Sequence, residues 1–302
     1  MRVLVSGSHG LIGSALVESL EGDGHEVTRL VRGRLPAGKG EAAWDPHEGT
    51  LDQAGIEGHD AVVHLAGAGL GDHRWTPEYK KEILESRVKG TLILTHALAR
   101  LDPKPSVLVS GSAVGFYGDR GDEEITEDSG PGAGFLAEVV RQWEAAALPA
   151  KEAEIRTVCV RSGIVQSAKG GGLKKLLLPF KLGLGGRFGS GKQWLSWVHI
   201  DDEVGAIRFA LENDSLTGPM NATSPNPVTI EDYSNALGRA VHRPTKIPTP
   251  TFALKALLGG EMTSEMLLGG QRVRPARLLA AGYRFRHPDL YEALAVALGD
   301  DG

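Results

Sequence analysis

Three glycines near the start of the chain have the spacing of a phosphate-binding turn. Gly7, Gly10 and Gly13 follow an apolar run at residues 3–5 and precede apolar residues that repeat at helical spacing over 11–20. Glycines leave no Cβ in the way, so the backbone can approach a pyrophosphate, and the free N–H groups of the helix can hold that anion. The spacing departs from the usual Gly-x-Gly-x-x-Gly, and a structural glycine turn is the alternative. The flanking strand and helix favour a dinucleotide-binding turn.

An arginine at the end of the second predicted strand favours NADP(H). The second predicted strand, at residues 26–31, ends at Arg32, nineteen positions after Gly13. An NAD enzyme carries Asp or Glu near this place to hold the ribose 2′-hydroxyl, whereas an arginine suits the 2′-phosphate of NADP. No acidic residue lies between 27 and 40, where Arg34 and Lys39 add positive charge. A solvated basic loop is the alternative.

The elements that must position these residues alternate between strands and helices. Predicted strands at 60–66, 106–110 and 155–160 are separated by helical patterns, which predicts an α/β fold with a doubly wound parallel (Rossmann) sheet. Ligands bind at the carboxyl ends of such strands, so the residues that follow them complete the expected site. The predicted cofactor-binding residues are Gly7, His9, Gly10, Leu11, Ile12, Gly13, Arg32, Leu65, Ala66, Gly67, Ser110, Arg161, Ser162 and Gly163.

The composition of the chain changes after about residue 165. Glycine-rich segments flank an amphipathic helix at 173–182, and proline-punctuated helices follow from Pro244. We predict an NADP-binding Rossmann domain over 1–165, to which 198–222 returns. A smaller, mainly helical substrate-binding lobe then takes 166–197 and 223–302. An apolar repeat near the end predicts helices packed in the core through Leu254, Leu257, Leu258, Met262, Met266 and Leu267.

Composition and charge limit the partners. The 302 residues are 41% hydrophobic and 24% charged, which suits a soluble globular protein of about two domains. A net charge of −5 gives no reason to expect nucleic acid or an anionic membrane. The single Cys159 excludes an internal disulfide, and a buried structural thiol is favoured over a nucleophile. No signal peptide, long apolar span or zinc-ligand spacing is apparent. We expect a cytoplasmic protein with a small-molecule substrate and no metal; a homodimer is left open.

The chain resembles the extended short-chain dehydrogenase/reductase superfamily, which contains sugar-nucleotide epimerases. The landmarks are the glycine turn, His64-Leu-Ala-Gly-Ala68, Val88-Lys-Gly-Thr91 and Ser110-Gly-Ser-Ala-Val-Gly-Phe-Tyr-Gly118. Segments such as Arg74-Trp75-Thr and residues 260–275 are similar to one branch, the YfcH-type epimerase-like proteins, some described as cell-division inhibitors similar to SulA. The resemblance implies NADP(H) binding and a family-specific C-terminal domain of about 50 residues.

The resemblance also implies a catalytic Ser on the fifth strand and a Tyr-x-x-x-Lys pair on the next helix. The Tyr exchanges the substrate proton, while the Lys lowers the pKa of the Tyr and holds the nicotinamide ribose. Ser112 matches the Ser. Phe135 and Val139 stand at the Tyr and the Lys, and neither can transfer a proton.

Three residues are candidates to replace the missing pair. Tyr117 lies five residues after Ser112, Arg87 stands in place of the usual Asn, and Glu138 lies on the helix that normally supplies the Tyr. A packed ring is the alternative for Tyr117, and a helix-surface carboxylate is the alternative for Glu138. We predict that Ser112 orients the substrate oxygen, Tyr117 exchanges the proton and Arg87 supports the ionised phenol.

These residues predict an NADP(H)-binding, epimerase/reductase-like enzyme with a non-standard active site. Its substrate is a small polar carbonyl or hydroxyl compound, with nucleotide sugars among the candidates. Trp75, Gln193 and Trp197 are the predicted substrate walls, under a flap at residues 166–197. The alternative is a regulatory protein that senses NADP(H) without turning it over, for example in cell division.

Overall fold

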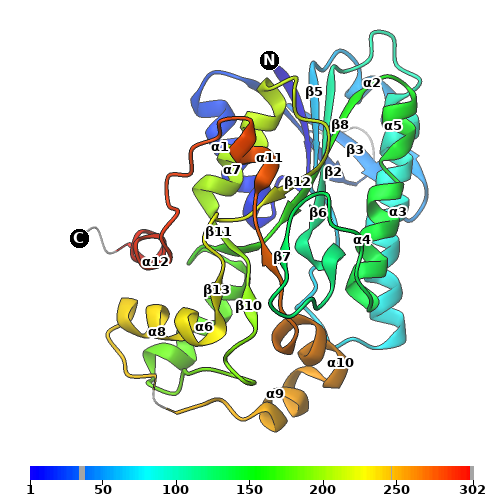
Figure 1. Cartoon of the computed structure of the whole chain (residues 1–302). Helices are drawn as coiled ribbons and strands as arrows, with labels where there is room; N and C mark the ends of the chain where they lie inside the picture. The colour runs from blue at the N-terminus through cyan, green and yellow to red at the C-terminus, as the bar shows by residue number, and fades with distance from the viewer. Residues whose placement is uncertain (34–37, 246, 300–302) are drawn as a thin grey trace. The chain divides into compact units, whose positions relative to one another are not determined.

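A computed structural model describes residues 1–33, 38–245 and 247–299, so Arg34 lies outside the described residues. The described residues form an eight-stranded sheet in the order β12-β8-β6-β5-β1-β2-β3-β4 (Figure 1). Parallel pairing joins β1 to β2 and β5, β2 to β3, and β5 to β6, while β4 is antiparallel to β3. The predicted doubly wound α/β (Rossmann) sheet is confirmed. Its strands are β1 (Arg2–Ser6), β2 (Glu26–Arg32), β3 (Glu41–Asp45), β4 (Thr50–Leu51), β5 (Ala61–His64), β6 (Val107–Ala113), β8 (Arg156–Ser162) and β12 (Gly218–Ala222).

The order of the strands reverses beside β1. The chain runs from β1 outward to β2 and β3, then returns to β5 on the other side of β1 and continues outward to β6. In open parallel sheets a ligand lies in the crevice outside the carboxyl ends at such a switch point. The ends of β1 and β5, at Ser6 and His64, therefore define where a cofactor fits.

The chain forms two compact units, and the first contains most of the sheet. It consists of Met1–Ser112, Val139–Val160 and Val204–Met220. Figure 1 shows α1 (Leu11–Gly22) on one face of the sheet and α3 (Pro77–Leu98) with α5 (Leu148–Glu152) on the other; a short α2 (Gln53–Ile56) precedes β5. Because both faces are covered, β1 needs apolar residues on both sides, and Val3, Leu4 and Val5 are completely buried.

The second unit consists of Ala113–Glu138, Arg161–Glu203 and Asn221–Gly302. Its short strands pair as β7 (Glu124–Ile125) with β14 (Arg272–Val273), β9 (Ile164–Gln166) with β11 (Trp197–His199), and β10 (Trp194–Leu195) with β13 (Val228–Thr229). One apolar cluster joins α6 (Gly171–Lys181), α8 (Ile230–Ala240) and α12 (Leu290–Leu298) around Trp197 and Tyr233. The helices that begin in this unit are η1 (Val114–Tyr117), α4 (Phe135–Ala145), α6 (Gly171–Lys181), α7 (Ile200–Glu212), α8 (Ile230–Ala240), α9 (Thr251–Leu258), α10 (Gly260–Thr263), η2 (Ser264–Leu268), α11 (Ala276–Ala280) and α12 (Leu290–Leu298).

Residues 113–138 group with the C-terminal residues, whereas the sequence placed them in the Rossmann domain. The parallel pairing of β7 with β14 is one reason. A second is Glu265, whose carboxylate accepts hydrogen bonds from the backbone N–H groups of Phe135 (2.7 Å) and Leu136 (2.8 Å). A carboxylate there satisfies free amides at the start of α4 and opposes the helix dipole favourably.

The predicted packing of the last apolar repeat is only half right. Met262 is buried, but α9 buries none of its residues, and Leu257 and Phe252 are 70% and 77% exposed. Helical periodicity indicates an apolar face without showing whether another element covers it. No helix within the described residues is long and apolar enough to cross a membrane.

Candidate functional site

The glycine turn after β1 is packed too closely for side chains. Gly7 has a φ of +69°, and a Cβ on it would lie 2.7 Å from the carbonyl carbon of Leu65. A Cβ on Gly13 would collide with the carbonyl oxygen of Gly7. The N–H of Gly10 donates to that same oxygen at 2.9 Å and closes the turn. Backbone therefore forms the floor of the crevice at the end of β1.

The start of α1 is open to an anion. Gly10 is its N-cap residue and makes no side-chain cap, and no acidic residue stands in the first turn. Free amides and the positive end of the helix dipole therefore remain available, which fits a pyrophosphate. Of the predicted contacts, His9 lies in the glycine turn, and Leu11 and Ile12 begin α1. Ser8 Oγ, also in the glycine turn, is buried without a partner among the described residues.

A buried chain of hydrogen bonds connects the ends of β1 and β5 with α3. Ser6 Oγ lies 2.6 Å from His64 Nδ1, His64 Nε2 lies 3.0 Å from Thr91 Oγ1, and Thr91 Oγ1 donates to the carbonyl of Arg87 at 2.7 Å. Because the Thr91 proton is used there, its oxygen accepts from Nε2–H, and Nδ1 accepts the Ser6 proton. Ser6 Oγ in turn accepts from the N–H of Leu65. Burial lowers the pKa of His64 to about 4, so the imidazole is neutral, as this order requires.

Arg87 lies beside the loop that follows β5. Its Nη1 donates to the carbonyl oxygens of Ala68 and Ile83, both at 3.0 Å, and its Cζ lies 5.1 Å from the ring centre of Trp143. A Cβ on Gly67 would lie 3.3 Å from the Arg87 side chain. The predicted cation is therefore at the edge of the crevice.

Ser112 is buried, and its hydroxyl is already engaged. Ser112 Oγ donates to Glu144 Oε1 at 2.6 Å, a length typical of a charge-assisted bond. Sequence reasoning did not identify Glu144, because it looked on this helix for the Tyr-x-x-x-Lys pair, whose positions are Phe135 and Val139. The periodicity of α4 could have identified it, since Glu144 follows the buried Val140 by four residues and so lies on the same helix face.

Tyr117 is completely buried in the second unit. Its hydroxyl donates to Asn221 Oδ1 at 2.7 Å and accepts from Arg161 Nη1 at 2.8 Å. Burial raises the pKa of Tyr117, although Arg161 opposes this shift. The cation beside this phenol is thus Arg161, and the predicted support from Arg87 is not what the contacts show. A satisfied, inaccessible hydroxyl favours the packed-ring alternative.

Residues 161–163 also have internal partners. Arg161 stacks on Phe116, 3.6 Å from the ring centre, and Ser162 donates to the buried carboxyl of Glu203. Burial raises the pKa of Glu203 to about 7. A Cβ on Gly163 would lie 2.8 Å from the carbonyl oxygen of Ser196. Their predicted cofactor contacts stay predictions.

The three predicted substrate walls have different surroundings. Trp75 is half-buried and donates to the carbonyl of Leu70 at 2.9 Å. Gln193 donates to the carbonyl oxygens of Phe188 and Leu267. Trp197 is completely buried in the apolar cluster of the second unit, so its prediction as an accessible wall is wrong. The residues beside Trp75 line a shallow pocket of about 400 Å³: His73, Arg74, Thr76, Glu78, Tyr79 and Glu82.

The remaining predicted residues lie at the surface or in the sheet. Arg32 ends β2 and is exposed, and its side chain makes no hydrogen bond or ion pair with the described residues. Ser110 is buried in β6, in register with His64 of β5. Glu138 is exposed on α4, which favours the helix-surface alternative.

A metal-ligand cluster appears where the sequence showed no ligand spacing. Asp201 Oδ2 lies 3.4 Å from His287 Nε2 and 3.7 Å from His199 Nδ1. However, His199 Nδ1 accepts a hydrogen bond from the N–H of Asp201 at 3.2 Å, so the lone pair that a metal needs is occupied. The occupied Nδ1 lone pair of His199 argues against a metal centre at these three residues.

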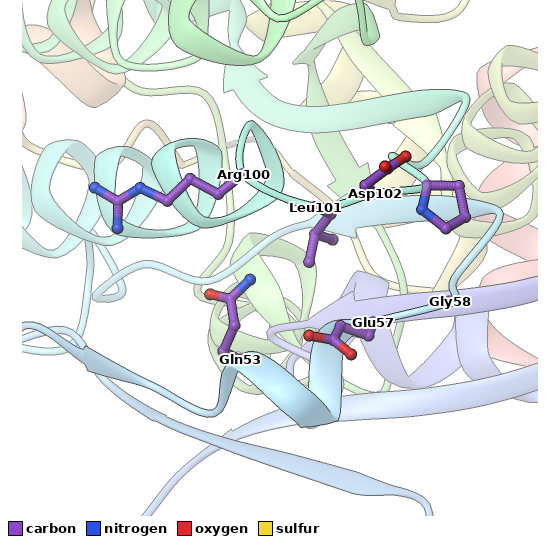
Figure 2. Close-up of a pocket in the computed structure, with 7 residues that line it drawn as sticks. Gln53, Glu57, Gly58, Arg100, Leu101 and Asp102 are labelled. Atoms are coloured by element: carbon purple, nitrogen blue, oxygen red, sulfur yellow. The ribbon is translucent and has the colours of Figure 1, made fainter.

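A pocket of about 640 Å³ lies at the amino ends of the strands, away from the glycine turn (Figure 2). Gly58 and Pro103, which precede β5 and β6, are among its lining residues, and Figure 2 shows the side chains of Gln53 and Arg100 around it. Because β5 and β6 are parallel, their amino ends lie away from the crevice at the glycine turn. This pocket is separate from the predicted cofactor site.

The model of the NAD dependent epimerase/dehydratase family matches residues 3–222. The chain belongs to this family. A second model, a domain of unknown function (DUF1731), matches residues 249–297. The epimerase family protein ML0860 of Mycobacterium leprae is 42% identical over 98% of this chain and 95% of its own length. The epimerase family protein SDR39U1 of Bos taurus is 41% identical over 97% of this chain and 98% of its own length.

Solved structures of relatives show the same fold. Human epimerase family protein SDR39U1 (isoform 2), crystallised with NADPH, is 37% identical, has a TM-score of 0.91 and covers 99% of this chain and 100% of its own. A nucleoside-diphosphate sugar epimerase from Corynebacterium glutamicum is also 37% identical, with a TM-score of 0.82; 99% of this chain matches 58% of that one. These matches confirm the resemblance to the extended short-chain dehydrogenase/reductase superfamily.

The buried His64 makes stability depend on pH. The unfolded chain takes up a proton below about pH 6.5, whereas folded His64 does so only near pH 4, so stability is lost as the pH falls through this window. Between pH 7 and pH 5 we expect the free energy of unfolding of the natural protein to fall by about 2 kcal/mol more than that of His64→Gln. Urea denaturation at both pH values measures this difference.

The comparison has internal controls. Glu203, whose pKa is raised to about 7, gains stability as the pH falls, but it is present in both proteins and cancels in the difference. His96, exposed on the same helix as Thr91, provides the matched variant His96→Gln. Equal pH dependence in the natural protein and His64→Gln would contradict the neutral, buried imidazole.

The Tyr117 hydroxyl should contribute to stability more than to cofactor binding. Tyr117→Phe leaves Arg161 and Asn221 each without one partner, and we expect a loss of about 1–3 kcal/mol in the free energy of unfolding. Tyr291→Phe, at an exposed tyrosine on α12, should change it little. If Tyr117→Phe is as stable as Tyr291→Phe, the hydroxyl is not the satisfied group that the contacts indicate.

Proposed function

We propose that the chain is an NADP(H)-dependent enzyme of the extended short-chain dehydrogenase type. One observation carries the proposal: the turn Gly7–Gly13 ends β1 at the switch point with no room for a Cβ and leads into an uncapped helix. The NADPH in the human relative, which matches over the full length of both chains, supports the same cofactor here. Arg32, exposed at the end of β2, is the proposed partner of the 2′-phosphate.

The substrate is a small polar compound that carries a carbonyl or hydroxyl group. The Corynebacterium relative is named as a nucleoside-diphosphate sugar epimerase, which supports a nucleotide sugar. Ser112 is the proposed group that orients the substrate oxygen, with Glu144 as its partner. The finer placement in the YfcH-type branch is part of this proposal.

A second candidate is a protein that binds NADP(H) and reports cofactor state to a partner without catalysis. The observation that favours it is the absence of an accessible proton-transfer group at the usual places. Phe135 and Val139 occupy the Tyr and Lys positions, and Tyr117 is completely buried.

Cofactor choice tests the proposal first. Arg32→Ala should weaken NADPH binding by about 1.5–3 kcal/mol, the range for a charge-assisted hydrogen bond, and leave NADH binding nearly unchanged. Fluorescence titration measures both affinities. Arg29→Ala is the matched control, since Arg29 lies on the same strand but pairs with Glu21 at 2.8 Å. Equal affinity of the natural protein for NADPH and NADH would refute the choice of NADP(H).

Turnover separates the two candidates. We expect a panel of carbonyl compounds, alcohols and nucleotide sugars to contain a substrate, with NADPH absorbance as the readout. With that substrate, Ser112→Ala should lower kcat at least ~10²-fold with NADPH affinity unchanged. Ser106→Ala, just before β6, is the control. Tight NADPH binding with no turnover across the panel would favour the sensing protein.

A further inference from the structure

Arg87 is held in a fixed position by the protein around it. Two hydrogen bonds from Nη1, both 3.0 Å long, tie it to the carbonyl oxygens of Ala68 and Ile83. The guanidinium lies over the ring of Trp143, with Cζ 5.1 Å from the ring centre. The Thr91 hydroxyl, at the end of the buried hydrogen-bond chain, also holds the Arg87 carbonyl. Arg87 therefore projects its guanidinium from a rigid base.

The remaining donors of this guanidinium have no acceptor among the described residues. Nε and Nη2 make no hydrogen bond with protein, and neither is a buried atom. No carboxylate of the described residues pairs with Arg87, although burial lowers its pKa to about 10 and it remains a cation at neutral pH. A half-buried cation without a counter-ion carries a desolvation cost, which an incoming anion would offset.

The open side of Arg87 belongs to the crevice that begins at the glycine turn. A Cβ on Gly67 would lie 3.3 Å from Arg87, and Gly7 packs in the same way against Leu65 and Ala66. The guanidinium and the uncapped start of α1 are thus connected by three consecutive residues at the end of β5. The helix end supplies about half a positive charge, and Arg87 supplies a full one.

We propose that Arg87 binds the pyrophosphate of the dinucleotide, together with the amino terminus of α1. A pyrophosphate carries two negative charges, more than a helix end alone balances. A guanidinium with adjacent free donors on Nε and Nη2 matches two phosphate oxygens in a bidentate arrangement. This inference rests on the proposed NADP(H) binding and assigns Arg87 to the cofactor and not to the reacting atoms.

Two ligands that differ in the pyrophosphate test the assignment. NADPH contains both a 2′-phosphate and a pyrophosphate, whereas adenosine 2′-phosphate contains only the former. Arg87→Gln should weaken NADPH binding about 10- to 100-fold and leave adenosine 2′-phosphate binding within about twofold. Arg87→Lys keeps the charge but loses the forked donor geometry. Its affinity for NADPH should lie between those of the natural protein and Arg87→Gln. Lys89→Gln, at an exposed lysine on the same helix, should change neither affinity.

The outcomes distinguish this inference from the proposed function. If the natural protein does not bind NADPH, the proposed function fails. If it does, and Arg87→Gln binds NADPH equally well, only the assignment of Arg87 is overturned. An equal loss for both ligands would mean that the substitution damages the glycine turn, and it would also overturn the assignment. If Arg87→Gln does not fold, Arg87→Lys is the deciding variant. The assignment of Arg87 to the pyrophosphate is overturned if Arg87→Lys binds both NADPH and adenosine 2′-phosphate as tightly as the natural protein does.

Discussion

The candidate site depends on the neutral imidazole of His64. Each hydroxyl in the chain Ser6–His64–Thr91 has one proton, so the donors are ordered in a single direction, from the N–H of Leu65 to the carbonyl of Arg87. A protonated ring would place two donors opposite Ser6 and Thr91 and break that order. Burial prevents this protonation by lowering the pKa of His64. Two strand ends and one helix are thereby fixed relative to one another within the first unit.

The consequence is a crevice made of backbone with charge at two points. Gly7 and Gly13 leave no room for side chains, so peptide groups line the turn. The start of α1 and Arg87 then supply the positive charge; the first turn of α1 contains no acidic residue, and no carboxylate of the described residues pairs with Arg87. Rigid, preorganised donors lose little entropy when a ligand binds. The hydrogen bonds of His64 and the open donors of Arg87 are thus parts of one arrangement.

The sequence predicted what depends on local patterns. Continuous apolar strands, the glycines between β1 and α1, and the alternation of strands and helices were enough for the sheet and the turn. It did not predict contacts between distant positions. The Tyr117 hydroxyl is bonded to Arg161 and Asn221, which lie 44 and 104 residues away in the sequence. Glu144 accepts from Ser112 over a separation of 32 residues. It misjudged Leu257, because an apolar face in the sequence does not reveal whether another element covers it.

The Ser112–Glu144 bond constrains any chemistry at this serine. A hydroxyl that donates its proton to a carboxylate presents only oxygen lone pairs to a ligand. Ser112 in this state would accept a hydrogen bond from a bound alcohol, and the Ser112–Glu144 pair would connect that alcohol proton to a carboxylate. A carbonyl offers no proton, so it would meet Ser112 productively only when Glu144 is protonated or the hydroxyl has rotated. The hydrogen bond seen here therefore suits an alcohol ligand better than a carbonyl ligand.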